Sequence, residues 1–158
     1  MLVQIVLFDG FDLLDALAPY EVFAAADLLS GGAIKVELVT AEGARSVASG
    51  TNGLPIAAGG TIDPGQAAIL VVPGASGDVA GAGPGSVPTI LHRASETKLT
   101  ALVGEALGKP GVTVATVCGG SLLLAMGGLM EGRHAVTHRL GMDALAATGA
   151  VPVAARVV

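Results

Sequence analysis

Residues 112–126 read VTVATVCGGSLLLAM, and this stretch decides the fold. Val112 to Val117 is a run of branched apolar residues, typical of a strand buried in a parallel sheet. From Ser121 to Met130 the apolar residues continue in a way that predicts a helix. Cys118 and two glycines stand between the two elements. The stretch therefore predicts a strand-to-helix elbow in which the cysteine backbone is strained and its side chain is exposed.

The elbow favours a reactive thiol at Cys118 over a small buried hydrophobe. A lone cysteine in an apolar chain is more often a core residue. Here, however, the small residues let the chain turn tightly and let a substrate approach. The N-terminal end of the following helix would also stabilise a thiolate. We therefore expect the pKa of Cys118 to lie below the ordinary value of about 8.5, so that the residue can act as a nucleophile.

Strand and helix patterns alternate along the rest of the chain. Strands are predicted at residues 2–8, 34–40, 67–72, 135–137 and 151–158, helices at 19–29, 95–107 and 142–147, short hairpins and turns at 41–65, and a long glycine-rich loop at 74–88. This order predicts one α/β domain over residues 1–158, with a mostly parallel sheet and helices on both faces. The expected architecture is a flavodoxin-like three-layer sandwich, whose sites lie at the carboxyl ends of the strands.

Composition and charge exclude several classes of protein. Apolar residues make up 52% and charged residues 13%, yet the longest apolar run, Leu122 to Met130, is about half of the ~18 residues that a membrane span needs. The start of the chain has no basic leader pattern, and the single cysteine excludes an internal disulfide. The net charge of −5 argues against a nucleic-acid partner. We expect a cytoplasmic protein without a membrane segment. No metal or other cofactor is expected, because no His/Cys/Asp cluster has ligand spacing.

Three stretches of the chain resemble the PfpI-type family of the class I glutamine amidotransferase-like superfamily. They are IVLFDGFDLLDALAPYEVF at residues 5–23, AILVVPGA at 68–75 and VATVCGGSLLLAMGGLMEGRHAVTH at 114–138. That family includes intracellular proteases, deglycase-like proteins and isonitrile hydratases. The third stretch is most similar to isonitrile hydratases and to the sensor domains of AraC-type regulators.

The resemblance implies partners for the thiol. Asp15 stands at the position of the family's acidic residue, so its carboxyl is expected to contact the sulfur and to act as proton donor or base. The alternative is an aspartate that caps the first helix. His138 matches a histidine that lies close to the active cysteine in some members. The turn at residues 72–75 matches the family's Pro-Gly-Gly turn, so the backbone N–H groups of Gly119 and Ala75 are the expected oxyanion donors.

The chain departs from the family pattern in two places. Isonitrile hydratases usually carry a threonine directly after the cysteine, and protease-like members carry a histidine. Gly119 provides neither side chain, so that group is absent or must be replaced, with Ser121 as the candidate. The strand–helix tail that follows Arg156-Val157-Val158 in relatives is also missing. Either the fold closes without the tail, or the chain is a fragment.

Three functions follow from this reading. The first is a cofactor-free, cysteine-dependent lyase of the isonitrile hydratase type, in which Cys118 attacks the isonitrile carbon and water releases an N-substituted formamide. The second is a glyoxalase- or deglycase-like enzyme that uses the same nucleophile on a small dicarbonyl such as methylglyoxal. The third is a non-catalytic sensor or ligand-binding domain. Gly119 favours the sensor, whereas the Asp15–Cys118 pair favours an enzyme.

A homodimer is the expected assembly. The predicted helix at residues 19–29 (PYEVFAAADLL) has apolar residues on more than one face. A single sheet can cover only one of these faces, so a stripe remains for a partner. The family resemblance points to the same helix. We therefore expect two copies of the chain to meet through residues 19–29.

Overall fold

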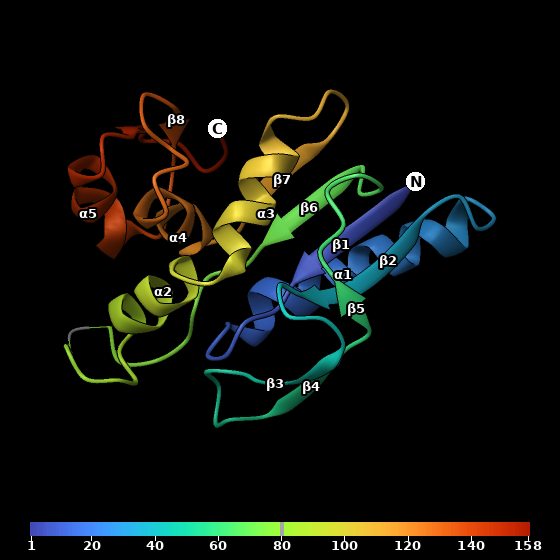
Figure 1. Ribbon diagram of the computed structural model, residues 1–158, viewed down its shortest axis with the longest axis horizontal. Coiled ribbons are helices and arrows are strands. Elements are labelled where there is room, and N and C mark those ends of the chain that lie inside the picture. Colours follow the sequence, from blue (N-terminus) through green and yellow to red (C-terminus); the bar gives the residue numbers. More distant parts are fainter. Residues whose placement is uncertain (80) are drawn as a thin grey trace.

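The computed structural model describes residues 1–79 and 81–158 (Figure 1). Within these residues five parallel strands form one sheet in the order β5–β2–β1–β6–β7. Its strands are β1 (Leu2–Val6), β2 (Lys35–Thr40), β5 (Gly60–Thr61), β6 (Ile69–Val72) and β7 (Thr113–Thr116). The register places Ile5 of β1 opposite Leu38 and Val71 of its two neighbours. The predicted α/β fold with a mostly parallel sheet is thereby confirmed.

Helices cover both faces of this sheet (Figure 1). On one face α1 (Leu13–Leu29) packs against β1 and β2, and on the other α3 (Lys98–Leu107) packs against β7. Beyond the carboxyl ends of the strands, α2 (Val87–Ser95) packs against α4 (Gly120–Met126), which in turn contacts α5 (Met142–Ala147). Because both faces are covered, the central strand β1 is buried almost throughout.

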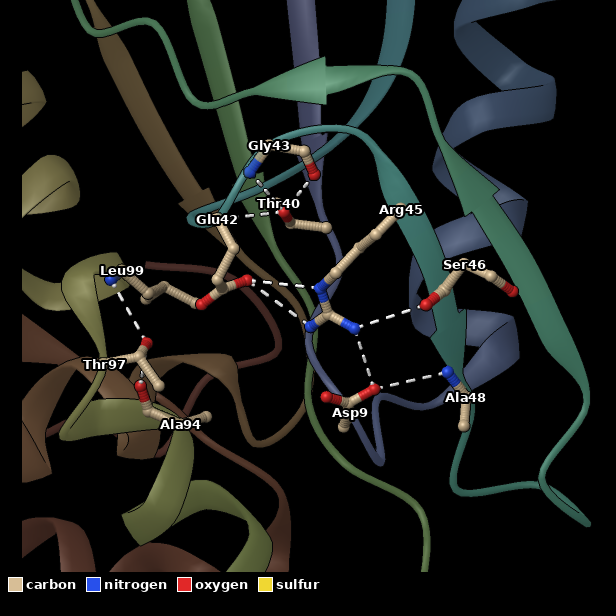
Figure 2. Close-up of polar contacts among 10 residues, drawn as sticks. All are labelled: Asp9, Thr40, Glu42, Gly43, Arg45, Ser46, Ala48, Ala94, Thr97 and Leu99. Carbon is tan, nitrogen blue, oxygen red and sulfur yellow. Dashed lines mark hydrogen bonds and ion pairs between the residues drawn. The ribbon is translucent and has the colours of Figure 1, made fainter.

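Two small sheets complete the fold. β3 (Arg45–Ala48) and β4 (Pro55–Ala58) form an antiparallel hairpin, and β8 (His134–Ala135) pairs in parallel with β9 (Val151–Pro152). Figure 2 shows how the hairpin is tied to the loop after β1. The Arg45 guanidinium donates to Asp9 Oδ1 at 3.0 Å and to Glu42 Oε2 at 3.4 Å. These charges lie near the surface, so they orient the hairpin and contribute little to stability.

The first helix begins at Leu13, not at Pro19 as the sequence predicted. Asp12 is its N-cap, because Asp12 Oδ1 accepts hydrogen bonds from the N–H groups of Leu14 and Asp15 at 2.9 and 3.2 Å. Pro19 therefore lies inside the helix. The capping function considered for Asp15 belongs to Asp12, which leaves the Asp15 carboxyl free for another contact.

The predicted loop at residues 74–88 runs into an unexpected helix, α2. The sequence placed a single helix at 95–107, whereas the structure has α2 followed by α3, separated by the N-cap Thr97. Pro88 was assigned to the end of the loop, but it stands in the first turn of α2, where a missing N–H costs nothing. Ala80, within the predicted loop, lies outside the described residues.

Three other expectations need correction. β7 is half-buried, not fully buried, because it lies at the edge of the described sheet. α4 ends at Met126, not at Met130, since Gly127 and Gly128 follow and Gly128 has a φ of +77°. The last predicted strand, 151–158, is reduced to β9. In the described part of the chain no helix is both long and apolar enough to cross a bilayer.

The close contact between α4 and β6 predicts that Gly120 tolerates no side chain. A Cβ at position 120 would lie 2.1 Å from the carbonyl oxygen of Val72, a backbone atom that cannot move aside. We expect Gly120→Ala to lower the free energy of unfolding by about 1–3 kcal/mol in urea denaturation. Gly59→Ala is the matched control, because a Cβ there meets open space. Equal stability of the two variants would contradict this packing.

Candidate active site

Three segments of the chain converge at the carboxyl edge of the sheet. Asp15 comes from the first turn of α1 after β1, Gly74 follows β6, and Cys118 follows β7. The chain passes from β1 to β2 on one side and later returns to β6 on the other, so β1 and β6 flank the point where the strand order reverses. Such switch points are where open parallel sheets bind ligands.

Cys118 has a left-handed backbone conformation with a φ of +52°. Residues other than glycine rarely adopt it, so the predicted strain at the elbow is confirmed. Hydrogen bonds hold both sides of the turn: the N–H of Val117 donates to the Val72 carbonyl at 3.0 Å, and that of Gly120 donates to the Val117 carbonyl at 2.8 Å. The Thr137 hydroxyl donates to the Cys118 carbonyl at 2.9 Å. The Cys118 side chain remains exposed.

Gly74 lets the carboxyl of Asp15 reach the sulfur. Its N–H donates to Asp15 Oδ2 at 3.0 Å, and the Asp15 carboxyl shares a hydrogen bond with the Cys118 thiol. A Cβ at position 74 would lie 2.6 Å from the nitrogen of Gly119 and 2.8 Å from Asp15 Oδ2. The structure thus brings together Asp15, Gly74 and Cys118, and only glycine fits at the centre of this contact.

The surroundings of Asp15 and Cys118 disfavour the ionised form of both side chains. Burial, followed by the nearby charge of Asp12, raises the pKa of Asp15 above its ordinary 3.8, although the Gly74 N–H, the thiol and His138 partly oppose the shift. Although Cys118 is exposed as a residue, its sulfur is partly desolvated; this desolvation, followed by the charge of Asp15, raises the pKa of Cys118 from 9.0 to about 11, with partial opposition from the Gly119 N–H. The expectation of a lowered thiol pKa is therefore wrong.

The prediction considered only the helix N-terminus and left out two causes that arise from the fold. Partial desolvation of the sulfur is the larger cause of the raised pKa of Cys118, and the charge of the nearby Asp15 carboxyl adds to it. At neutral pH the sulfur keeps its proton. A nucleophile must therefore be generated by transfer of that proton to Asp15.

A small pocket of about 200 Å³ opens above the sulfur. Thr137, His138 and Gly119 contribute to its lining, and His138 Nδ1 accepts a hydrogen bond from the Leu140 N–H at 3.3 Å. In the neutral ring the proton is therefore on Nε2. The remaining lining is mostly apolar and includes Val79, Val87, Leu91, Leu122, Met126 and Leu140. The pocket can thus hold a small molecule with a hydrocarbon group next to a thiol and an imidazole, while the Asp15 carboxyl contacts the thiol from outside the lining.

The family follows from a comparison with known sequences. The model of the DJ-1/PfpI family matches residues 1–158, which is the whole chain. The chain belongs to the DJ-1/PfpI family. No curated protein matches it, and the family match does not distinguish isonitrile hydratases from other members.

Solved structures of several other proteins share the fold. A ThiJ/PfpI family protein from Pseudomonas syringae is 26% identical, with a TM-score of 0.75, and the match covers 99% of this chain and 58% of that one. DJ-1 from Schizosaccharomyces pombe is 19% identical, with a TM-score of 0.72 over 100% of this chain and 78% of that one. An AraC family transcriptional regulator from Pseudomonas putida is 18% identical, with a TM-score of 0.66 over 98% and 76%.

Some of these relatives are much longer than this chain. The chain spans 42% of a two-domain protein from Anabaena variabilis that has DJ-1/ThiJ/PfpI-like and ferritin-like domains, a match with 20% identity and a TM-score of 0.72. The likenesses at 18–20% identity show the fold alone. What distinguishes this family member must therefore be argued from its own residues.

The other predicted site residues lie in different surroundings. Ala75 is buried, pairs with Phe11 and is not among the residues that line the pocket, so its function as an oxyanion donor stays a prediction. Ser121 is buried, and its hydroxyl donates to the Val136 carbonyl at 2.6 Å. It therefore cannot replace a hydroxyl at position 119. The sequence reading missed Thr137, although it is next to His138.

Metal binding has no support in the described residues. Across residues 1–79 and 81–158, no group of three or more His, Cys, Asp or Glu side chains could hold a metal ion. The chemistry that the observed groups can perform is proton transfer between Asp15 and Cys118, combined with attack by sulfur.

The coupling between Asp15 and Cys118 predicts two effects of Asp15→Asn, a lower thiol pKa and a more stable fold at neutral pH. Without the carboxylate charge, the thiol pKa falls below about 11, so the rise of iodoacetamide alkylation with pH shifts to lower pH. Asp15 itself has a raised pKa in the fold, so ionising it destabilises the fold as pH rises from below 3.8 through the folded pKa. The variant should therefore be more stable than wild type at pH 7, with the gain shrinking toward pH 3. An unchanged alkylation profile would contradict the coupling.

Proposed function

We propose that this family member is a cofactor-free, cysteine-dependent lyase that hydrates isonitriles to N-substituted formamides. The observation that carries the proposal is the hydrogen-bonded Asp15–Cys118 pair beneath an apolar pocket. An isonitrile carbon must receive both a nucleophile and a proton. A thiol and a carboxyl that share a proton supply both at one place.

The reaction begins with addition of the thiol across the isonitrile carbon. The thiol proton passes to the Asp15 carboxylate, and the carboxyl then protonates the lone pair of that carbon. Sulfur attacks the same carbon, and the carbon–nitrogen triple bond becomes a double bond. The product of this step is a thioimidate, R–N=CH–S, on Cys118. The raised thiol pKa is compatible with this route, because the thiolate forms only during the reaction.

Water completes the hydration. Its oxygen adds to the thioimidate carbon while one of its protons goes to the nitrogen. The carbon–sulfur bond then breaks and the carbonyl forms, as Asp15 accepts the second water proton from the hydroxyl of the adduct and passes it to the sulfur. The sum is RNC + H₂O → RNHCHO, with Asp15 and Cys118 restored. His138 lines the pocket, and we assign to its Nε2–H a hydrogen bond to the nitrogen of the thioimidate.

A non-catalytic sensor is the second candidate, favoured by Gly119. The position after the cysteine carries no side chain, and Ser121 does not replace it. The dicarbonyl reading has less support, because the Gly119 N–H already contacts the sulfur and Ala75 does not line the pocket. The proposal includes a cytoplasmic location, because an active free thiol needs a reducing compartment.

The test of function is a turnover assay with a small alkyl isonitrile. By NMR we expect wild type to form the N-alkylformamide, Cys118→Ser to form none, and Asp15→Asn to be slower by about 10²-fold or more. Conversion of methylglyoxal to lactate without formamide formation would replace the proposal with the dicarbonyl reading. Absence of turnover on both compounds would leave the sensor reading.

We also propose that two copies of the chain meet through α1. Leu14, Val22 and Leu29 are 74%, 67% and 88% exposed, and with the exposed Ala18 and Ala25 they follow one helical stripe at spacings of four and three residues. A stripe of this kind on a long helix is typical of an interface. It also begins beside Asp15, so dimerisation would cover the helix that carries the acidic residue of the site.

Val22→Asp places a charge in the middle of this stripe. We expect wild type to be a dimer at micromolar concentration in light scattering coupled to size exclusion, and Val22→Asp to be a monomer, because a buried unpaired charge is costly. Leu54→Asp is the control, since Leu54 is exposed at the hairpin and not on α1. A monomeric wild type would overturn the dimer.

A further inference from the structure

We propose that Leu91 of α2 is the specificity-determining residue of the Cys118 pocket and that it selects uncharged substrates with a slender hydrocarbon group. For the identity of the reacting group this inference rests on the proposed function. The size and polarity of the group beside it are argued from the pocket alone.

Leu91 borders the space that a side chain at position 119 would take. A Cβ built on Gly119 lies 3.3 Å from Leu91 Cδ1 and 3.8 Å from Cδ2, and 3.5 Å from the Cα of Gly74. Leu91 itself is fully buried and lines the pocket. A polar group beside the nucleophile is thus replaced by a methyl-bearing wall that comes from a different helix.

α2 is held firmly enough for this wall to define a shape. The neighbouring Ile90 packs onto the loop after β1, where a Cβ at Gly10 would meet Ile90 Cγ2 at 2.6 Å. The N–H of Val87 donates to the Asp78 carbonyl at 2.8 Å, which anchors the first turn. Leu91 therefore packs against the elbow from a helix that is fixed in place, so its side chain cannot easily move away from a substrate.

The charges around the pocket disfavour anionic substrates. Among the described residues neither lysine nor arginine lines the pocket, so a carboxylate or phosphate would meet no such partner there. Asp12 and Asp15 lie close enough to raise the thiol pKa by their charges, and these charges repel anions. A volume of about 200 Å³ is somewhat larger than an apolar cavity of about 150 Å³ that takes benzene. The pocket therefore has room for a neutral group of roughly benzene volume, and Leu91, next to position 119, restricts the width of that group beside the sulfur.

The experiment measures alkylation of Cys118, which needs no turnover. Second-order rate constants for a series of N-alkylmaleimides, and for iodoacetamide against iodoacetate, are each divided by the value for glutathione at the same pH. In wild type we expect this relative rate constant to rise by about fourfold for each methylene added to the maleimide's alkyl group, until the pocket is full. For the tert-butyl reagent it should be at least tenfold lower than for the n-butyl reagent. Iodoacetate should lag iodoacetamide by at least tenfold more than it does with glutathione.

Variants at position 91 assign these effects to Leu91. Leu91→Ala should raise the tert-butyl to n-butyl ratio by about tenfold or more, and the milder Leu91→Val should shift it in the same direction by less. Leu99→Ala is the control, because Leu99 is an equally buried leucine on α3 that does not line the pocket. It should leave the ratio at its wild-type value.

The outcomes separate this inference from the proposed function. Size selectivity that is the same in wild type, Leu91→Ala and Leu91→Val, or equal relative rates for the anionic and neutral reagents, would overturn the inference even if isonitriles are hydrated. If the size selectivity depends on Leu91 but the protein forms no formamide, the inference about Leu91 stands and the proposed lyase activity is wrong.

Discussion

The left-handed backbone of Cys118 is the constraint on which the rest of the site depends. A non-glycine residue held at a φ of +52° costs of order 1–3 kcal/mol, and it persists only where its surroundings fix it. Here α4 must approach β6 so closely that only Gly120 fits against the Val72 carbonyl. Gly74 must in turn be bare to lie against Gly119 and to hold the Asp15 carboxyl. The position of the sulfur, its acidic neighbour and the floor of the pocket therefore follow from one turn.

That turn places two acids where neither ionises easily. The pKa of Asp15 and that of Cys118 are both raised, each partly by burial and partly by negative charge nearby. A pair of this kind titrates as a unit, and over a wide range of pH it holds one proton between sulfur and carboxyl. The fold thus stores an unfavourable charge at its functional edge, a common cost of active sites. Beside this pair, the walls from α2 and α4 are mostly apolar, so the shared proton and the apolar pocket suit the same neutral substrate.

Local patterns were sufficient to predict most strands of the sheet and the elbow, because each depends on residues that are neighbours in sequence. Asp15 and the turn at residues 72–75 came instead from the resemblance to the family. α2 was missed because Pro88 was assigned to the preceding loop, and with α2 the sequence reading lost Leu91. The N-cap function of Asp12 became clear only from the hydrogen bonds of the cap. The pKa of Cys118 was predicted in the wrong direction, because burial and the nearby Asp15 charge arise from the fold, whereas the helix dipole can be inferred from sequence.

The pH dependence of kcat/KM for isonitrile hydration, measured from pH 4 to 11.5, tests most directly whether the pair works through its shared proton. The account predicts a bell-shaped profile. Its acid limb follows the raised pKa of Asp15, its plateau covers the range in which the pair holds one proton, and its alkaline limb lies near the thiol pKa of about 11. A rate that instead keeps rising in proportion to the thiolate, in parallel with iodoacetamide alkylation, would show that the thiolate alone reacts and would contradict the function assigned to Asp15.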